Sequence, residues 1–211
     1  MEGTLEKLLA KYPELSACET DIQRAFETLR DCFQGGGKLL VCGNGGSAAD
    51  AEHIVGELMK GFMLRRPVSE ADRAAFVEQF GEDGTYLADH LQGALPAVSL
   101  VGHSALSTAY ANDVAPDLVF AQQVYGYGRD GDVLLAISTS GNSNNVLQAV
   151  RVARLKGLRT IALTGRDGGL LRDLCELSIV VPADSTPDIQ ERHLPIYHAL
   201  CIMLEEAFFQ Q

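Results

Sequence analysis

Two short segments rich in glycine, serine and asparagine have residue types that suit the binding of an anion. Residues 43–47 read GNGGS, and residues 138–143 read STSGNS. Glycine lets the backbone approach an anion closely, and serine and threonine hydroxyls donate directional hydrogen bonds. A helix that begins after such a loop adds unpaired N–H groups and a partial positive charge. We therefore predict phosphate binding at both segments, with helix capping by the same residues as the alternative.

His53 and Glu57 form a second group that could carry chemistry. They are four residues apart in the sequence, a spacing that places both on one face of a helix, one turn apart. A histidine and a carboxylate in this arrangement can bind a zinc-type metal or act as an acid and a base. A solvated helix face without chemical function is the alternative.

The C-terminal stretch adds Gln190 and His198, which are eight residues apart. At 100° per residue they differ by about 800°, or two turns plus 80°, so both can lean toward one side of a helix. Nitrogen and oxygen donors from two helices suit a tetrahedral zinc ion, although glutamine is an uncommon zinc ligand. Pro195 lies between them, where it either kinks one helix and redirects His198 or separates two shorter helices.

Neither glycine-rich segment is a common nucleotide-binding motif. The segment GNGGS lacks the GxGxxG spacing, and the chain contains no GxxxxGK(S/T) motif. The sequence therefore gives little support to an NAD or ATP site.

The elements that must position these residues follow an α/β pattern. Five apolar runs predict strands of a parallel sheet, and helical patterns separate most of them. Right-handed crossovers then place helices on both faces, which gives a three-layer α-β-α sandwich with a five-stranded parallel sheet, of the flavodoxin or Rossmann-like type. The predicted strands are residues 38–42, 96–102, 132–138, 159–165 and 177–183.

The helical patterns lie before, between and after these strands. Glycines end the first of them, and both glycine-rich loops lead directly into helices. Thr186 is placed to cap the last helix, and Pro187 suits its first turn. The predicted helical regions are 1–35, 48–59, 144–156 and 187–209.

The composition excludes several classes of protein. The chain has 211 residues, 17 basic and 28 acidic side chains, and a net charge of −11. That balance argues against a general nucleic-acid binder, which needs clustered Lys and Arg. No apolar run is long enough for a membrane helix, and the first residues lack the pattern of a secretory signal. The five cysteines contain no CxxC pair, so we expect reduced, buried thiols in the cytoplasm.

Residues 68–95 stand apart from this pattern. A connection of this length usually carries structure of its own or forms a lid. It contains helical patterns with a break at Gly81–Gly84, and its six acidic residues and one basic residue account for five of the eleven negative charges. Because acidic side chains would repel a phosphate, we expect the segment to face solvent or a neighbouring subunit and not the second glycine-rich loop.

Five segments carry a resemblance to a known family, in the order LLVCGNGGSAADAEHIVGEL, YANDVAPDLVFAQQV, GDVLLAISTSGNSNNVLQAV, ALTGRDGG and IQERHLPIYHAL. They resemble the sugar isomerase (SIS) domain of the phosphoheptose isomerases over nearly the whole chain except 68–95. The resemblance implies a single SIS domain over 1–211, with an N-terminal helical segment 1–35 and an insertion at 68–95. It also implies a cytoplasmic homotetramer with its sites at subunit interfaces.

Members of this family interconvert sedoheptulose 7-phosphate and D-glycero-D-manno-heptose 7-phosphate for the heptose of lipopolysaccharide core and other cell-surface glycans. The resemblance thus implies an aldose–ketose isomerase with a phosphorylated sugar substrate and one zinc ion per subunit. It gives Glu57 and His198 as the acid/base pair. By the same resemblance, the zinc ligands are His53, Glu57, Gln190 and His198, and the substrate-binding positions are Asn44, Gly45, Gly46, Ser47, Asn112, Asp113, Ser138, Thr139, Ser140, Ser143 and Gln190.

Two other functions stay open. A close relative in the family binds the bacterial replication initiator protein, and it keeps most of the same motifs. Sugar isomerase domains also serve as phosphosugar sensors in regulators, although no DNA-binding helix pair is appended to this sequence. The presence of all four candidate ligands and of both acid/base positions favours the enzyme.

Overall fold

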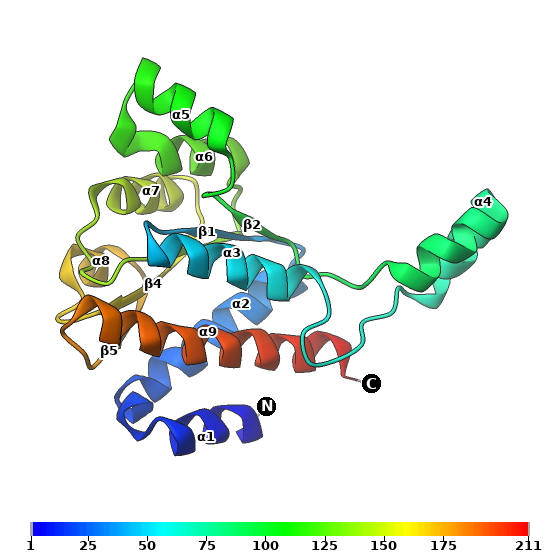
Figure 1. The fold of residues 1–211 in the computed structure, drawn as a ribbon, viewed down its shortest axis with the longest axis horizontal. Coiled ribbons are helices and arrows are strands. Elements are labelled where there is room, and N and C mark those ends of the chain that lie inside the picture. Colours follow the sequence, from blue (N-terminus) through cyan, green and yellow to red (C-terminus); the bar gives the residue numbers. More distant parts are fainter. Residues whose placement is uncertain (1, 211) are drawn as a thin grey trace.

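The computed structural model describes residues 2–210 and contains a five-stranded, all-parallel sheet with helices on both faces (Figure 1). The strand order is β2-β1-β3-β4-β5. This confirms the predicted fold class, and each predicted strand is present, shorter than its apolar run except β4. The strands are β1 (Leu39–Cys42), β2 (Ala97–Ser99), β3 (Val133–Ile137), β4 (Arg159–Gly165) and β5 (Leu177–Val181).

Alternating side chains of the sheet enter two separate hydrophobic clusters. On β1, Leu39 and Val41 belong to the cluster on one face, whereas Leu40 and Cys42 belong to the cluster on the other. The first face is covered by α1 (Glu2–Lys11), η1 (Pro13–Cys18), α2 (Glu19–Gln34), α3 (Gly46–Met59) and α9 (Thr186–Phe209). On the opposite side lie α5 (Ser104–Asp113), η2 (Pro116–Leu118), α6 (Val119–Tyr127), α7 (Asn144–Leu155) and α8 (Gly169–Leu174).

The cysteines belong to this interior. All five are free and buried, as predicted from their number and spacing. Within residues 2–210, no helix is both long enough and apolar enough to cross a membrane.

The long C-terminal helix α9 differs from the prediction at its start. Its cap is Ser185, whose side chain accepts a hydrogen bond from the backbone N–H of Asp188, so the prediction of Thr186 as cap is wrong by one residue. Thr186 is the first helical residue, and Pro187 lies in the first turn as predicted. The helix continues through Pro195, which excludes two separate helices. Buried residues on both sides of the proline hold it against the sheet.

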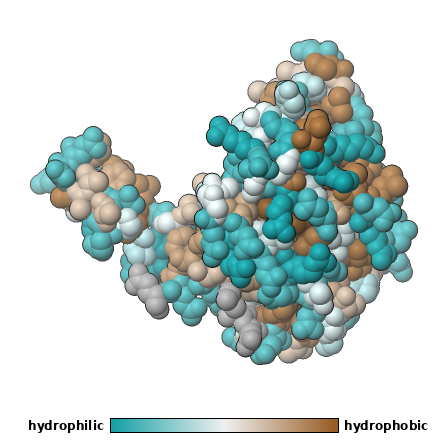
Figure 2. Space-filling model, turned by 180° about the vertical axis from the view of Figure 1, so that it is seen from behind, coloured by the Kyte–Doolittle hydropathy of each residue, from teal (hydrophilic) through white to brown (hydrophobic). Residues whose placement is uncertain are grey.

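Within the segment between α3 and β2, residues 69–90 form an arm that stands off the body of the molecule (Figures 1 and 2). Its helix α4 (Glu70–His90) reverses direction at Gly81, where φ is 56° and ψ is −122°. At Gly84 the returning half lies directly on the backbone of Phe76, which leaves no room for a side chain. The break predicted at Gly81–Gly84 is therefore present, and Figure 1 places the arm on the other side of the body from α7 and α8.

Candidate active site

The two glycine-rich loops lie at the point in the sheet where the strand order reverses. β1 pairs with both β2 and β3, so the chain winds outward from β1 toward both edges of the sheet. Residues 43–47 follow β1 and residues 138–143 follow β3. In open α/β sheets, ligands bind in the crevice outside the carboxyl ends of two such strands. The topology thus places both predicted phosphate loops at the ligand-binding edge.

The helices that follow these loops begin without side-chain caps. No side chain caps α3 after Gly45 or α7 after Ser143, whereas Ser69 caps α4 and Ser185 caps α9. The Ser143 hydroxyl lies 3.0 Å from the Ser138 hydroxyl. Neither helix start therefore has a side-chain cap, although the backbone N–H groups of Ser47, Ala48 and Val146 already donate to nearby carbonyls.

The second loop is held in shape by its own hydrogen bonds. The Ser140 hydroxyl accepts from the backbone N–H of Asn142 at 3.2 Å, and the carbonyl of Thr139 accepts from Gly165 at 3.2 Å. Gly141 has a φ of 66° and lies against the backbone of Gly168, so a larger residue has no space there. A loop fixed in this way loses little further entropy on binding a ligand.

Two amide side chains join the loops. Asn44 and Asn145 each donate to the other's side-chain oxygen at 2.9 Å. Sequence analysis selected Asn44 but missed Asn145, because its role depends on a contact across the sheet edge. The side chain of Gln190 from α9 packs directly on Gly46, and Ser47 is buried in the first turn of α3. The predicted residues of the first loop therefore lie beside the second loop and the start of α9.

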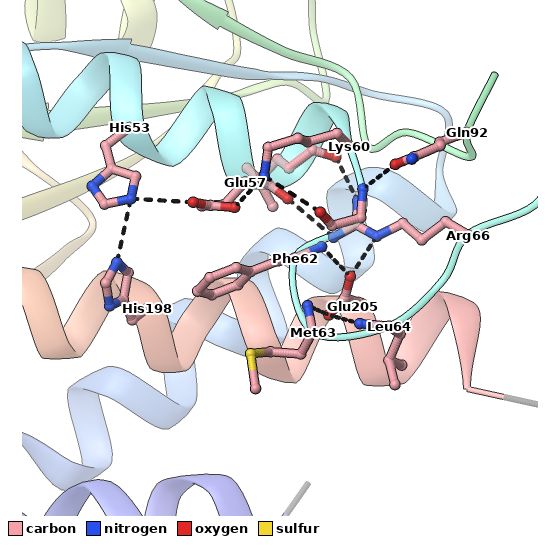
Figure 3. A network of polar contacts seen from close by, with 12 residues as sticks. His53, Glu57, Lys60, Phe62, Met63, Leu64, Arg66, Gln92, His198 and Glu205 are labelled. Atoms are coloured by element: carbon pink, nitrogen blue, oxygen red, sulfur yellow. Dashed lines mark hydrogen bonds and ion pairs between the residues drawn. The ribbon is translucent and has the colours of Figure 1, made fainter. Parts of the chain in front are cut away.

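A cluster of three ionisable side chains lies farther along α3 and α9 (Figure 3). His53 Nε2 is 3.2 Å from Glu57 Oε1 and 3.5 Å from His198 Nε2. The 3.6-residue repeat brings His53 and Glu57 onto one face of α3, and the packing of α9 against α3 supplies His198. The structure thus brings together both predicted acid/base residues and a third candidate ligand.

Glu57 is held in its ionised form. Its Oε2 accepts from Lys60 Nζ at 2.8 Å, and only 12% of its side chain is exposed. Partial burial acts to raise the pKa of Glu57, but the hydrogen bonds and charges of Lys60 and His53 outweigh it, so the pKa lies below its usual range. At neutral pH this carboxylate is available as a base.

His198 is held in its neutral form. Burial and the neighbouring His53 lower its pKa, and the charge of Glu57 only partly opposes them. A neutral imidazole has one donor and one acceptor nitrogen. His198 can therefore exchange a proton with a group lying between α3 and α9.

The donor types of this cluster fit zinc, although they do not already form a cage. Two imidazoles and a carboxylate are ordinary zinc ligands. The distances from His53 Nε2 to Glu57 Oε1 and to His198 Nε2 are close to the separation of about 3.3 Å between ligand atoms around a tetrahedral zinc ion. However, no group of three or more His, Cys, Asp and Glu side chains among residues 2–210 is arranged to hold a metal ion. The fourth predicted ligand, Gln190, packs on Gly46 at the first loop.

Beside the cluster, toward the C-terminal ends of both helices, a buried ion pair ties the end of α3 to α9 (Figure 3). Arg66 Nε donates to Glu205 at 2.8 Å, and both side chains are fully buried. The other guanidinium nitrogens donate to the carbonyls of Glu57 and Leu58, while the ring of Phe209 lies 4.7 Å from the guanidinium. The arginine thus fixes the last turn of the helix that carries Glu57.

Glu205 also holds the loop after α3. Its carboxylate accepts from three successive backbone N–H groups, those of Phe62, Met63 and Leu64, at 2.7–3.0 Å. Burial acts to raise its pKa, but these bonds and Arg66 outweigh it and lower the pKa. Sequence analysis missed this pair, since the residues are 139 positions apart and match no local pattern.

The remaining predicted pair, Asn112 and Asp113, lies away from this cluster. Both are exposed at the end of α5, where Asn112 donates to Asp113 at 2.9 Å. None of the ten residues of α5 is buried. Within one chain, these two side chains therefore do not join the loops or the histidines.

Comparisons with known proteins show which family this chain is similar to. The SIS domain family matches residues 7–82 and 78–165. A phosphoheptose isomerase of Pelobacter propionicus is 44% identical over 181 residues, covering 86% of this chain and 82% of the relative. One of Citrifermentans bemidjiense is 40% identical over 209 residues, covering 99% and 94%.

Two solved structures show the same likeness in three dimensions. The phosphoheptose isomerase GmhA of Neisseria gonorrhoeae is 35% identical, with a TM-score of 0.69 over 94% of this chain and 98% of that one. A phosphoheptose isomerase of Francisella tularensis is 33% identical, with a TM-score of 0.77 over 94% and 92%. Both the sequence and the fold of this chain are thus similar to those of proteins named phosphoheptose isomerase.

Proposed function

The chain belongs to the phosphoheptose isomerase family of SIS-domain proteins, and on this premise we propose that it interconverts sedoheptulose 7-phosphate and D-glycero-D-manno-heptose 7-phosphate. The observation that carries the proposal is that His53 contacts both Glu57 on its own helix and His198 on the facing helix. This cluster occupies the same two helices whose first turns lie at the anion-binding loops.

The reaction moves protons and leaves the carbon skeleton unchanged. A base removes a proton from C1 of the ketose, which gives an enediol, and an acid returns a proton to C2. The hydroxyl proton on O1 leaves and one is gained on O2, so atoms and charge balance. Ionised Glu57 is suited to remove the carbon-bound proton, and neutral His198 on the facing helix is suited to move protons between solvent, oxygen and carbon.

The loops orient the other end of the sugar. The starts of α3 and α7, with the hydroxyls of Ser138, Thr139, Ser140 and Ser143, bind the phosphate. Asn44, held by Asn145, adds a directed polar contact, and Gly45, Gly46 and Ser47 form the floor of the first loop. Fixing the phosphate limits the positions of C1 and C2 relative to Glu57, which is how binding energy lowers the barrier.

Zinc is part of the proposal because the donor types fit it. His53, Glu57 and His198 would hold the ion, and Gln190 would complete the set after turning away from Gly46. A bound zinc ion supplies positive charge that polarises the carbonyl and stabilises the enediolate.

We further propose a cytoplasmic homotetramer in which each chain acts as a single SIS domain. Two features support assembly. Helix α5, which carries Asn112 and Asp113, has no buried residue. The arm exposes large apolar side chains, Val77, Phe80 and Tyr86 among them. Neighbouring copies would cover these faces and bring Asn112 and Asp113 to a site. Analytical ultracentrifugation measures the number of chains.

A direct assay tests the activity. Purified protein is incubated with sedoheptulose 7-phosphate, with and without a chelator, and the aldose is measured. We expect turnover by the wild type, loss of turnover in Glu57→Gln, and retained binding of the phosphosugar by that variant. Glu78→Gln, in the arm, is the matched control and should behave as the wild type. Full turnover by Glu57→Gln would refute the assignment of the base.

A further inference from the structure

The end of α7 carries three cations that no described acidic side chain neutralises. Arg151, Arg154 and Lys156 lie within six residues, and α7 contains no aspartate or glutamate. Arg154 donates to the carbonyl of Leu174 at 3.2 Å and Lys156 to that of Tyr125 at 2.7 Å, so both contacts are to uncharged oxygens. The end of α7 is therefore a positively charged spot on a chain whose net charge is −11.

Apolar side chains are exposed among these cations. Leu155 is 82% exposed, the highest value for a large apolar residue in the described part of the chain. Tyr125, on α6, is also exposed, and its ring lies 4.9 Å from Lys156 Nζ. Arg151 is four residues before Leu155, so both lie on one face of α7. We call this surface the α7 patch; its members are Tyr125, Arg151, Arg154, Leu155 and Lys156.

The arm combines exposed apolar side chains with the opposite charge. Val77, Phe80 and Tyr86 are exposed on it, and Figure 2 shows hydrophobic and hydrophilic residues side by side there. Glu82 and Asp83 are exposed directly after the reversal of α4, and among residues 2–210 neither side chain forms an ion pair. The arm and the α7 patch are thus complementary in charge, and both leave apolar surface open to solvent.

Two other occupants of the patch fit less well. Figure 1 places the arm on the other side of the body from α7, so the arm of the same chain does not cover the patch. Two arms packed on each other would bring like charges together, because residues 68–95 hold six acidic residues and one basic residue, and that residue, Arg73, is paired with Asp89. The arm of a second copy supplies both the acidic and the apolar side chains.

We infer that the arm of one chain docks on the α7 patch of a second copy. Phe80 and Tyr86 of the arm then cover Leu155 and Tyr125, and the acidic tip faces the cations of α7. The inference deepens the proposed homotetramer and rests on it for the number of chains. A contact between two different surfaces closes when each copy returns it, so two chains related by a two-fold axis share two arm–patch contacts.

Charge reversal on each side, alone and together, tests this contact by sedimentation of the full-length protein. Glu82→Lys with Asp83→Lys should raise the dissociation constant of the assembly about 100-fold, because like charges then meet. Arg151→Glu with Arg154→Glu should do the same. The four changes together should restore the dissociation constant to within about 10-fold of the wild type, since opposite charges face each other again.

The matched control adds Lys7→Glu and Lys11→Glu, on α1, to the reversed arm. It has the same net charge as the fourfold variant, and its assembly should stay weak. The reversed positions are exposed in the chain, and urea unfolding checks that each variant is folded. An assembly unchanged by the reversed arm, no restoration in the fourfold variant, or equal restoration by the α1 control would overturn the inference.

Cross-linking gives a second measurement that does not depend on the reversed variants. The native cysteines are buried, so a short bismaleimide should join Asp83→Cys to Leu155→Cys when the two variants are mixed. Absence of that product would overturn the inference. Turnover of sedoheptulose 7-phosphate is measured separately. Cross-linking and restored assembly in a protein without turnover would support the contact and refute the isomerase.

Discussion

The single connection between α3 and β2 contains a tightly held part and an exposed part. Residues 61–66 are fixed by Glu205, which accepts three backbone N–H groups and the guanidinium of Arg66. A few residues later the chain leaves the body as the arm (Figure 1). Its ion pair, Arg73 with Asp89 at 2.6 Å, has side chains that are 36% and 48% exposed.

The contrast between the buried ion pair and the exposed arm shows which part of the molecule makes the site rigid. The buried pair holds the carbonyls of Glu57 and Leu58 and thus the end of the helix that carries the cluster. The arm adds no described hydrogen bond to that cluster. We conclude that the body alone positions the ionisable residues and that the arm serves contacts outward from the subunit.

The largest expected effect on stability comes from replacing the arginine of the buried ion pair. Replacing the arginine of the exposed pair in the same way tests the contrast between the two regions. Arg66→Met leaves the carboxylate of Glu205 buried without its cation, so the free energy of unfolding should fall by about 3–5 kcal/mol. Arg73→Met removes the matching exposed cation of the arm and should cost less than about 1 kcal/mol. Urea unfolding of both variants measures the difference. Equal losses would contradict the contrast between the two regions.

The pH dependence of stability should be dominated by a histidine of the body. His193 is fully buried, contacts the carbonyl of Thr164 at 3.2 Å, and burial lowers its pKa to about 4. Because the unfolded chain binds the proton near pH 6.5, stability is complete above that pH and is lost as the pH falls toward 4. The loss should reach about 3 kcal/mol.

Unfolding by urea at a series of pH values tests this. His193→Gln should remove most of the slope between pH 6.5 and 4, whereas His90→Gln, in the arm, should leave it unchanged. A slope that persists in His193→Gln would assign the acid sensitivity to other groups.

Deleting the arm should have the smallest effect on the folded subunit. Pro67 and Gln92 form an antiparallel bridge at its base, so an Asn-Gly turn can replace residues 69–90. We expect the free energy of unfolding to change by less than about 1 kcal/mol for each chain, since the arm buries little of the body. Thermal and urea unfolding check this, and ultracentrifugation shows whether assembly depends on the arm. A large loss of stability in the monomer would contradict the division between body and arm.

The sequence predicted the sheet, the two loops and the His53–Glu57 pair because each depends on local spacing. The apolar runs and glycines mark strands and turns, and an interval of four residues fixes a helix face. It did not predict Asn145, Arg66 or Glu205, whose roles arise from contacts across the sheet edge or between α3 and α9. Thr186 was selected over Ser185 as the cap of α9 because both residue types suit that position and only backbone geometry separates them.

The most direct test of the proposed site is isomerisation in D2O followed by proton NMR. Wild-type protein given sedoheptulose 7-phosphate should form the aldose phosphate with deuterium at C2, because the proton held by Glu57 exchanges with solvent. Glu57→Gln should form none over the same period while it still binds the phosphosugar. Product formed by Glu57→Gln at the wild-type rate, or no product from the wild type, would contradict the account.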